Sequence, residues 1–308
     1  MDTMVKDRTE KALAAHAAGA TAPKHVMLSV VIPAYNEERG IQGAVERVRT
    51  ALAAQPFDWD VIVVNDGSTD GTLAAAQASG ARVVDSAVNN GYGSALKLGI
   101  AAGSSDYVAI IDADGTYPAE ELPKMLKLAQ GADMVVGDRG AAMQNVPLAR
   151  RPAKWILNGL ANYLAQRKIP DLNSGLRIFR RDALTPFIPL LPSGFSFTTT
   201  ITMCMLSSNM RVAYVPISYG RRIGTSKVRP RDFFNFVLLV LRVIMLFNPL
   251  RIFLPLGAIL FALGIAKTIY DFFLMNLSES AIFALLAALL IWSLGLIADM
   301  ISRLHLRP

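Results

Sequence analysis

The stretch Val108-Ala109-Ile110-Ile111-Asp112-Ala113-Asp114-Gly115-Thr116-Tyr117-Pro118 decides how this chain is organised. Uncharged residues, mostly strand formers, lead into two carboxylates spaced one residue apart, and a Gly and a Pro then end the strand. A buried strand that delivers two acids at its carboxyl end is costly unless positive charge meets them there. In an open α/β sheet that edge binds ligands, and oxygen ligands at this spacing suit Mg²⁺ or Mn²⁺ carrying a nucleotide diphosphate. A solvated acidic turn is the alternative, because D-x-D alone is a weak motif.

The composition allows one sizeable domain together with a membrane-embedded part. The chain has 308 residues, of which 53% are hydrophobic, with a mean hydropathy of +0.37 and a formal net charge of +7. A basic balance fits nucleic acid, an anionic lipid surface or phosphorylated substrates. The hydrophobicity favours the last two, so no nucleic-acid partner is expected. The single cysteine, Cys204, excludes an internal disulfide and fits a reducing compartment.

Apolar strands alternate with helical segments from Met27 to Gly137. Strands are expected at 27–32, 60–64, 82–84, 107–112 and 133–137, and helices at 36–54, 72–79, 91–102 and 119–130. Near-continuous apolar strands separated by helices predict an α/β fold, with a mainly parallel sheet covered on both faces. Residues 1–25 are rich in Ala and lack the apolar core of a secretory signal, so we interpret them as a flexible N-terminal extension.

Acidic and small residues collect just after three of the expected strands. The segments are Pro33-Ala34-Tyr35-Asn36-Glu37, Asn65-Asp66-Gly67-Ser68 and Asp112-Ala113-Asp114. Since the carboxyl ends of parallel strands meet at one edge of a sheet, these segments predict a nucleotide-sized crevice there. No G-x-G-x-x-G follows the first strand and no Walker A motif occurs, which argues against dinucleotide redox chemistry and P-loop hydrolysis.

Three motifs in this part of the chain carry a family resemblance. V-I-P-A-Y-N-E-E, V-V-N-D-G-S-T-D-G-T and D-A-D-G-T-Y-P, in this order, resemble the nucleotide-sugar-binding half of family 2 inverting glycosyltransferases, which have the Rossmann-like GT-A fold. The resemblance is to polyprenyl-phosphate sugar synthases, of the dolichol-phosphate mannose synthase or undecaprenyl-phosphate glucosyltransferase type, and covers residues 27 to 230.

The resemblance implies roles for individual residues. Pro33, Tyr35, Glu37 and Asp66 would bind the nucleoside, with Asp66 holding the base, and Asp112 and Asp114 would handle the diphosphate and its Mg²⁺ or Mn²⁺. Related synthases carry a Gln where this chain has Thr116, which leaves the third protein ligand of the metal open.

Basic residues further along the chain are candidates for phosphate binding. Asp171–Arg181 places three arginines beside a Ser-Gly turn. An ordinary basic strand is the alternative, but the bidentate fork of Arg suits phosphate, and the segment resembles the S-G-[LF]-R block of the synthases. These candidates are Ser174, Arg177 and Arg180, and the next block adds Asp138 and Arg139 near donor or acceptor phosphate. The predicted catalytic residues are Asp112, Asp114, Arg139 and Arg177.

A last basic segment precedes the apolar C-terminal part. Arg222, Ser226 and Lys227 fit the family form R-x-G-x-S-K, which implies that they grip the phosphate of a lipid acceptor or the donor diphosphate. The alternative is a juxtamembrane cluster that attracts anionic headgroups, and both roles are compatible with an anionic lipid acceptor.

The C-terminal part predicts a membrane hairpin. Segment 231–249 suits a juxtamembrane interfacial helix, whereas 252–274 and 281–301 are each long enough to cross a hydrocarbon core of about 30 Å. The connection between them holds no Lys or Arg, while arginines flank the pair, so the hairpin is expected to enter from and return to the cytoplasm. The expected plan is an extension (1–25), a cytoplasmic GT-A catalytic domain (26–230), the interfacial helix (231–249), two transmembrane helices within 250–303 and a cytoplasmic tail (304–308).

Together these features predict an integral membrane enzyme, at the inner or plasma membrane if bacterial. It would move one sugar with inversion from a nucleotide-diphosphate sugar to polyprenyl phosphate, with a UDP-sugar favoured over GDP-mannose. A transferase with another lipid or a polysaccharide as acceptor is one alternative, although no tryptophan follows an arginine as the Q-x-x-R-W block of processive synthases requires. An inactive lipid-binding scaffold is another, against which the retained Asp112 and Asp114 argue. Relatives with short hairpins suggest a homo-oligomer.

Overall fold

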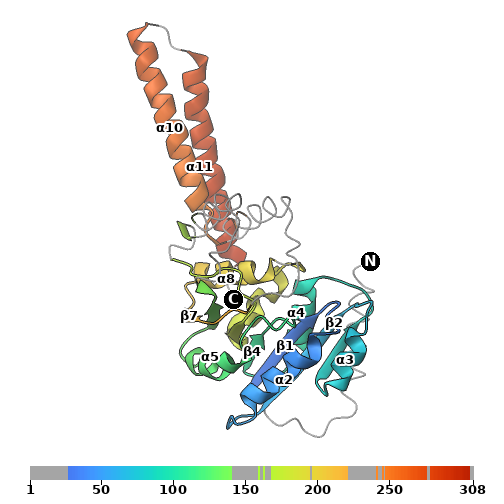
Figure 1. Ribbon diagram of the computed structural model, residues 1–308. Coiled ribbons are helices and arrows are strands. Elements are labelled where there is room, and N and C mark those ends of the chain that lie inside the picture. The colour runs from blue at the N-terminus through green and yellow to red at the C-terminus, as the bar shows by residue number, and fades with distance from the viewer. Residues whose placement is uncertain are drawn as a thin grey trace.

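A single mixed sheet organises the N-terminal part of the chain. The computed structural model describes residues 27–140, 168–194, 196–220, 247–275 and 278–305, together with 159, 162, 163, 241 and 245. Seven strands lie in the order β3-β2-β1-β4-β6-β5-β7 (Figure 1). They are β1 (Leu28–Ala34), β2 (Trp59–Asp66), β3 (Arg82–Ser86), β4 (Tyr107–Ile110), β5 (Met134–Asp138), β6 (Arg177–Arg180) and β7 (Val212–Pro216).

Most neighbouring strands run parallel, as the sequence predicts. β1 lies between β2 and β4 and is parallel to both, β2 is parallel to β3, and β5 is parallel to β7. Only β6 runs antiparallel to its neighbours, β4 and β5. Because the chain leaves β1 first to one side and later returns on the other, the sheet has a topological switch point between β1 and β4.

The helices follow the expected pattern with shifted ends. They are α2 (Ile41–Leu52), α3 (Thr72–Ala78), α4 (Tyr92–Ala102), α5 (Leu122–Ala129), α7 (Arg181–Leu184) and α8 (Phe197–Ser207), with 3-10 turns η2 (Ala119–Glu121) and η5 (Thr185–Leu190). The helix expected from Asn36 begins only at Ile41, because Asn36 adopts a positive φ of 55° and the chain turns before the helix. The strand expected to reach Asp112 ends at Ile110, so both aspartates lie in the loop that follows.

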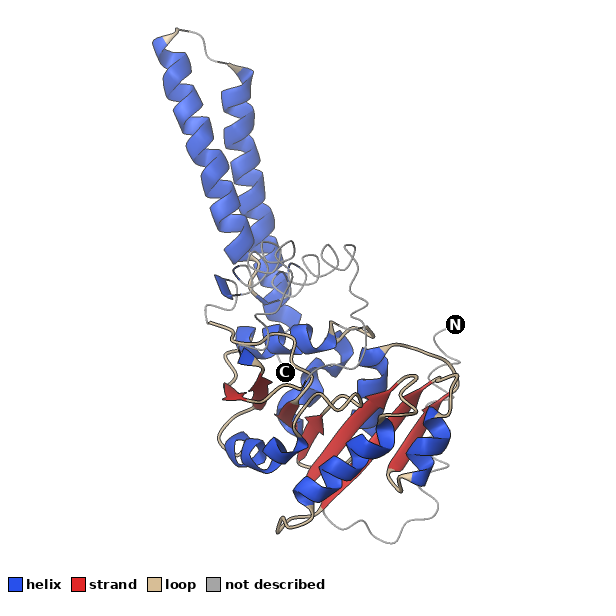
Figure 2. Cartoon of the chain, viewed as in Figure 1, coloured by secondary structure: helices blue, strands red, loops and turns tan. Residues whose placement is uncertain are grey.

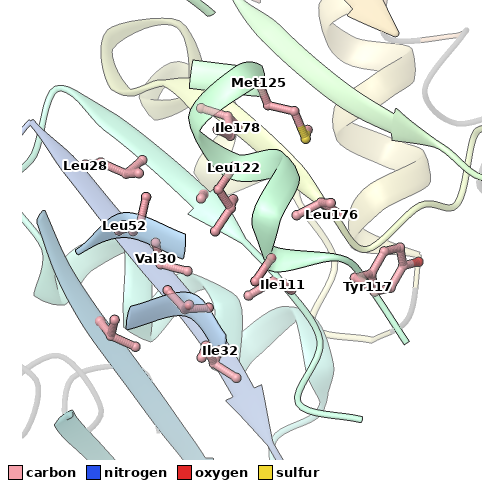
Figure 3. Close-up of a cluster of buried hydrophobic side chains, with 14 of the residues drawn as sticks. Leu28, Val30, Ile32, Leu52, Ile111, Tyr117, Leu122, Met125, Leu176 and Ile178 are labelled. Atoms are coloured by element: carbon pink, nitrogen blue, oxygen red, sulfur yellow. The ribbon is translucent and has the colours of Figure 1, made fainter. Parts of the chain in front are cut away.

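Alternate residues of the strands build two apolar layers, one on each face of the sheet. Val30, Ile32 and Ala109 pack with the buried faces of α2, α3 and α5 (Figure 3). Val31, Ile62 and Ile110 pack instead with α4 and α8. A sheet buried on both faces explains why its strands read as continuous apolar runs rather than as alternating ones.

The C-terminal part is a hairpin of two long helices, α10 (Leu250–Phe273) and α11 (Glu279–His305), that projects from the α/β domain on the side of α8 (Figure 2). Both helices are long and apolar enough to cross a membrane. The mean hydropathy of an 18-residue stretch is 2.1 in α10 and 2.6 in α11, and only 11% and 17% of these stretches are buried. A Cβ on Gly257 would lie 2.3 Å from Trp292, and one on Gly264 would lie 2.8 Å from Leu285, so small residues let the helices pack closely.

A charged pair lies near the end of α10, close to the turn of this hairpin. Lys267 pairs with Asp271 on α10, and Asp271 also accepts a hydrogen bond of 3.0 Å from the backbone N–H of Ser278. Asp271 therefore joins the end of α10 to the segment before α11, which is a structural role.

Of the predicted domain plan, the extension (1–25) and most of the interfacial helix (231–249) and of the tail (304–308) lie outside the described residues.

Candidate active site

The loops after β1 and β2 are tied together at the carboxyl edge of the sheet. The backbone N–H of Asn36 donates to Ser68 Oγ at 3.0 Å, and Asn36 Oδ1 accepts from the N–H of Thr69 at 2.9 Å. The N–H of Glu37 donates to Thr72 Oγ1 at 2.8 Å. These bonds hold the positive φ of Asn36 and fix the predicted nucleoside residues on either side of it. Pro33 is buried in β1, Tyr35 is 44% exposed and Glu37 is half-buried.

Asp66 ends β2 and holds the turn that begins α4. It is buried, and its Oδ1 and Oδ2 accept from the backbone N–H groups of Asn90 and Gly91, each at 2.9 Å. A Cβ on Gly67 would lie 2.5 Å from Asn89 N, so the two loops are in close contact. A carboxylate has lone pairs left after two such bonds. The predicted role of Asp66 toward a base remains a prediction.

Asp112 and Asp114 lie half-buried in one turn after β4, and protein donors orient both. The hydroxyl of Tyr92 donates to Asp112 Oδ1 at 2.9 Å. Asp114 Oδ1 accepts from the N–H and the hydroxyl of Thr116, at 3.1 and 2.6 Å. Gly115 between them has a φ of 71°, which favours Gly and brings the turn back on itself. Thr116, the position that the resemblance left open, is thus a hydrogen-bond donor to Asp114.

The donor set of this turn fits a divalent cation of the Mg²⁺ or Mn²⁺ type. Among the described residues, no three His, Cys, Asp or Glu side chains are grouped as they would be in an all-protein metal cage. Mg²⁺ commonly takes one or two carboxylates from the protein and completes its shell with substrate phosphates and water. Asp112 and Asp114 are such a pair, and an all-oxygen set without His or Cys does not suit Zn²⁺.

A second polar cluster adjoins the aspartate turn. Arg139 donates to both carboxylate oxygens of Asp171, from Nε at 2.7 Å and Nη2 at 2.9 Å, and its Cζ lies 5.3 Å from the ring centroid of Tyr219. Burial alone would raise the pKa of Asp171, but the bonds with Arg139 outweigh it and leave that pKa below its usual value. Neighbouring Asp138 accepts from the N–H of Gly140 at 2.9 Å. The guanidinium of Arg139 is therefore already paired with Asp171, and its predicted role in phosphate binding remains a prediction.

The chain after β7 returns to the aspartate turn. The N–H of Gly220 donates to the carbonyl of Thr116 at 2.8 Å, and the ring of Tyr219 meets that of Tyr117 edge-on, with centroids 5.1 Å apart. The basic segment with Arg222, Ser226 and Lys227 follows directly in sequence but lies outside the described residues. Gly220, the last described residue before that segment, is therefore anchored to the aspartate turn at Thr116.

The structure places Ser174 and Arg177 in the interior, and their predicted roles in phosphate binding and catalysis stay predictions. Both are fully buried. The guanidinium of Arg177 donates to the carbonyls of Ser174 (2.8 Å) and Leu172 (2.9 Å) and to Thr202 Oγ1 (2.5 Å). Burial lowers the pKa of Arg177. Arg177 therefore holds the loop 172–174 from inside the protein.

The structure places Arg180 at the opposite edge of the sheet from the aspartate turn, and its predicted phosphate contact stays a prediction. β6 runs antiparallel to β4, which pairs Arg177 with Ile110 near the site but Arg180 with Tyr107 at the amino end of β4. There the guanidinium bonds Asp133 at 2.8 Å and Asp182 at 2.6 Å. Three residues of strand span about 10 Å, which separates two arginines that look adjacent in the sequence.

Sequence reasoning missed several residues that surround Asp112. Tyr92 donates to it, and the N–H of Gly175 donates to Tyr117 Oη at 2.7 Å. A Cβ on Gly175 would lie 2.5 Å from Asp112 Oδ2, so the backbone lies directly against the carboxylate. The only local signal was the run Gly91-Tyr92-Gly93, an aromatic residue between two glycines at the start of a helix.

Comparison with protein families agrees with this geometry. Residues 29–186 match the model described as Glycosyl transferase family 2. The chain is a family 2 glycosyltransferase. Residues 248–304 match the model of the GtrB C-terminal hairpin, which covers α10 and α11. The predicted enzyme class, fold class and family resemblance are thereby confirmed.

Several relatives of this glycosyltransferase are named for polyprenyl-phosphate acceptors. Dolichyl-phosphate hexose transferase of Haloferax volcanii is 33% identical over 208 residues, which covers 66% of this chain and 87% of that protein. Undecaprenyl-phosphate mannosyltransferase of Micrococcus luteus is 30% identical, covering 64% and 86%. The match to low-salt glycan biosynthesis hexosyltransferase Agl6 of Haloferax volcanii, 33% identical, covers 65% of this chain but only 49% of that protein.

Solved structures with the same fold contain nucleotide and metal. Glucosyl-3-phosphoglycerate synthase of Mycobacterium tuberculosis in complex with Mg²⁺ and UDP superimposes with a TM-score of 0.55 at 26% identity, covering 71% of this chain and 79% of that one. Its complex with Mn²⁺, UDP and phosphoglyceric acid gives a TM-score of 0.56 at 25% identity, covering 71% and 78%. A divalent cation of this kind is therefore supported for the family.

Proposed function

We propose that this glycosyltransferase moves one sugar, with inversion, from a nucleotide-diphosphate sugar to polyprenyl phosphate. A UDP-sugar is the favoured donor and GDP-mannose the second. The observation that carries the proposal is the turn with Asp112 and Asp114 at the topological switch point, in a chain that also has a C-terminal hairpin suited to a membrane. The names of the relatives support the acceptor, and the UDP complexes of the structural neighbours support the donor.

The carboxyl edge of the sheet would bind the donor. Pro33, Tyr35 and Glu37 would line the nucleoside site, and Asp66 would accept from the base with lone pairs not used by the turn before α4. Asp112 and Asp114 would hold Mg²⁺ or Mn²⁺, which neutralises the departing diphosphate when bound. The contacts from Tyr92 and Thr116 keep these two carboxylates oriented before the donor arrives, which is preorganisation rather than a cost at the time of reaction.

The acceptor phosphate would attack the anomeric carbon from the face opposite the leaving diphosphate. One carbon–oxygen bond forms to the acceptor while the bond to the diphosphate oxygen breaks, which inverts the configuration. A phosphate monoester is already an anion at neutral pH, so no strong general base is needed. The chain must instead bring two anions together, and Arg139, Asp138, Arg222, Ser226 and Lys227 are the residues proposed to position them.

The hairpin would bring the lipid acceptor to this site. With α10 and α11 in the bilayer, the catalytic domain and the C-terminus would lie in the cytoplasm, because arginines flank the domain-side ends of the two helices and the positive-inside rule favours that side. Gly220, bonded to Thr116, starts the basic segment that leads toward the membrane part. An anionic lipid headgroup would thus meet basic residues close to the aspartate turn. A homo-oligomer remains part of the proposal.

The test is a transfer assay with purified full-length protein, Mg²⁺ or Mn²⁺, short-chain polyprenyl phosphate and a panel of radiolabelled UDP- and GDP-sugars. We expect label from one donor to enter the organic phase, and NMR of the product to show the inverted anomer. Polyprenol without phosphate is the control acceptor and should receive nothing. Equal transfer to polyprenol would refute the phosphate acceptor, and nucleotide binding without any transfer would point to another acceptor. If the protein neither binds nucleotide nor transfers sugar, the inactive scaffold would be favoured.

A further inference from the structure

Tyr92 links Asp112 and Asp66, the carboxylates that the proposed function assigns to the diphosphate and to the base of the donor. It is the first residue of α4, and its hydroxyl donates to Asp112 Oδ1 at 2.9 Å. The two residues before it, Asn90 and Gly91, are held by the oxygens of Asp66. A short path of hydrogen bonds and backbone therefore runs from the end of β2, through Tyr92, to the turn after β4.

The segment before α8 also fixes the backbone around Tyr92. The N–H of Ser94 donates to the carbonyl of Ser193 at 3.1 Å. A Cβ on Gly93 would lie 2.2 Å from the carbonyl oxygen of Pro192, and one on Gly91 would lie 2.8 Å from that of Ser193. The segment before α8 thus packs directly on the start of α4, and only glycines allow it to come so close. Tyr92 has little freedom to move away from Asp112.

The other side of the Asp112 carboxylate is closed by backbone. A Cβ on Gly175 would lie 2.5 Å from Oδ2 and 2.9 Å from both Cγ and Oδ1 of Asp112. Gly175 itself is held by its N–H bond to Tyr117 Oη. The carboxylate therefore lies between a hydroxyl donor and a packed main chain, which leaves it a single orientation.

We propose that Tyr92 is a positioning residue that orients Asp112 toward the metal-bound diphosphate and couples it to Asp66. The proposal rests on the function proposed above. Hydrogen-bonding partners of metal-binding side chains fix their orientation, and their loss costs about 10–100-fold in metal affinity or activity.

The test compares Tyr92→Phe with Tyr214→Phe in the full-length protein. Both changes delete the hydroxyl of a half-buried tyrosine, but the hydroxyl of Tyr214 has no hydrogen-bond partner among the described residues. Calorimetry measures the dissociation constant of UDP with and without Mn²⁺. We expect Tyr92→Phe to weaken UDP binding about 10-fold or more in Mn²⁺ and to leave binding without metal within twofold of the wild type. Tyr214→Phe should match the wild type in both.

The outcomes separate this inference from the proposed function. If wild-type protein binds UDP equally with and without Mn²⁺, the proposed function fails. If the wild type depends on Mn²⁺ and Tyr92→Phe binds as it does, the inference is overturned. An equal loss with and without Mn²⁺ would also overturn it, because Tyr92 would then only shape the nucleotide site. Unfolding temperatures measured on the same samples, together with UDP binding retained without Mn²⁺, show that each variant is folded.

Discussion

Replacing Gly175 by Ala should move the Asp112 carboxylate with a single methyl group. The new Cβ would lie 2.5 Å from Asp112 Oδ2, whereas an ordinary contact begins at 3.4 Å. The carboxylate or the loop must therefore retreat by about 0.9 Å. Gly175 does not have a positive φ, so the cost arises from this contact rather than from backbone strain.

The magnitude of the effect follows from the size of this shift. Extra atoms in a packed site cost about 1–3 kcal/mol of stability. A displacement of about 1 Å at a reacting group can cost about 10²-fold in rate. We therefore expect Gly175→Ala to lose about 100-fold in sugar transfer and to stay folded, with a modestly lower unfolding temperature.

The assay is metal-dependent transfer to polyprenyl phosphate, run beside thermal unfolding. Gly131→Ala is the matched control, because its nearest neighbour would be 3.8 Å away and its φ is not positive. It should transfer sugar within twofold of the wild type. Wild-type transfer by Gly175→Ala, or a similar loss in both variants, would refute the view that the backbone at Gly175 holds Asp112 in place.

Three further predictions concern other parts of the site. Arg180→Ala should leave transfer within twofold of the wild type and cost at most about 1 kcal/mol in chemical denaturation, because its ion pairs are partly exposed and remote; a large loss of transfer would contradict its placement. Thr116→Val should raise the Mn²⁺ concentration needed for half-maximal transfer about 10-fold, since Asp114 loses a donor, whereas Thr116→Ser should not. The Asp171–Arg139 pair lowers the folded-state pKa of Asp171, so its stabilisation is present above the usual carboxyl pKa of 3.8 and is lost as the pH falls through the lowered value. The unfolding free energy of Asp171→Asn should accordingly depend less on pH in acid than that of the wild type, and parallel pH profiles would contradict this.

Local patterns predicted the sheet, the aspartate turn and the hairpin. Asp112 and Asp114 are visible because they follow an apolar strand and precede a Gly turn, and the two long helices because span length and hydropathy are properties of one continuous segment. The order and direction of the strands beyond β4 are not local properties. The sequence therefore could not show that β6 enters the sheet antiparallel, which is what takes Arg180 away from the site.

The residues that the sequence did not reveal act through contacts between distant segments. Tyr92 reaches Asp112 from the start of α4, and Gly175 reaches it from the loop before β6, the strand that pairs with β4. Arg177 looks like a phosphate ligand because of its charge, yet three carbonyl and hydroxyl acceptors surround it in the interior. Buried polar groups find partners within the fold, so charge type alone does not distinguish a ligand-binding arginine from a structural one.

The central claim is that the Asp112–Asp114 turn binds the metal and diphosphate of a sugar donor for transfer to polyprenyl phosphate. The most direct measurement is sugar transfer by the wild type and by Asp114→Asn, across a titration of Mn²⁺ and after removal of divalent cations with chelator. We expect wild-type transfer to require the cation and Asp114→Asn to lose it by at least about 100-fold while unfolding at a similar temperature. Transfer that persists in chelator, or that Asp114→Asn retains, would contradict the claim.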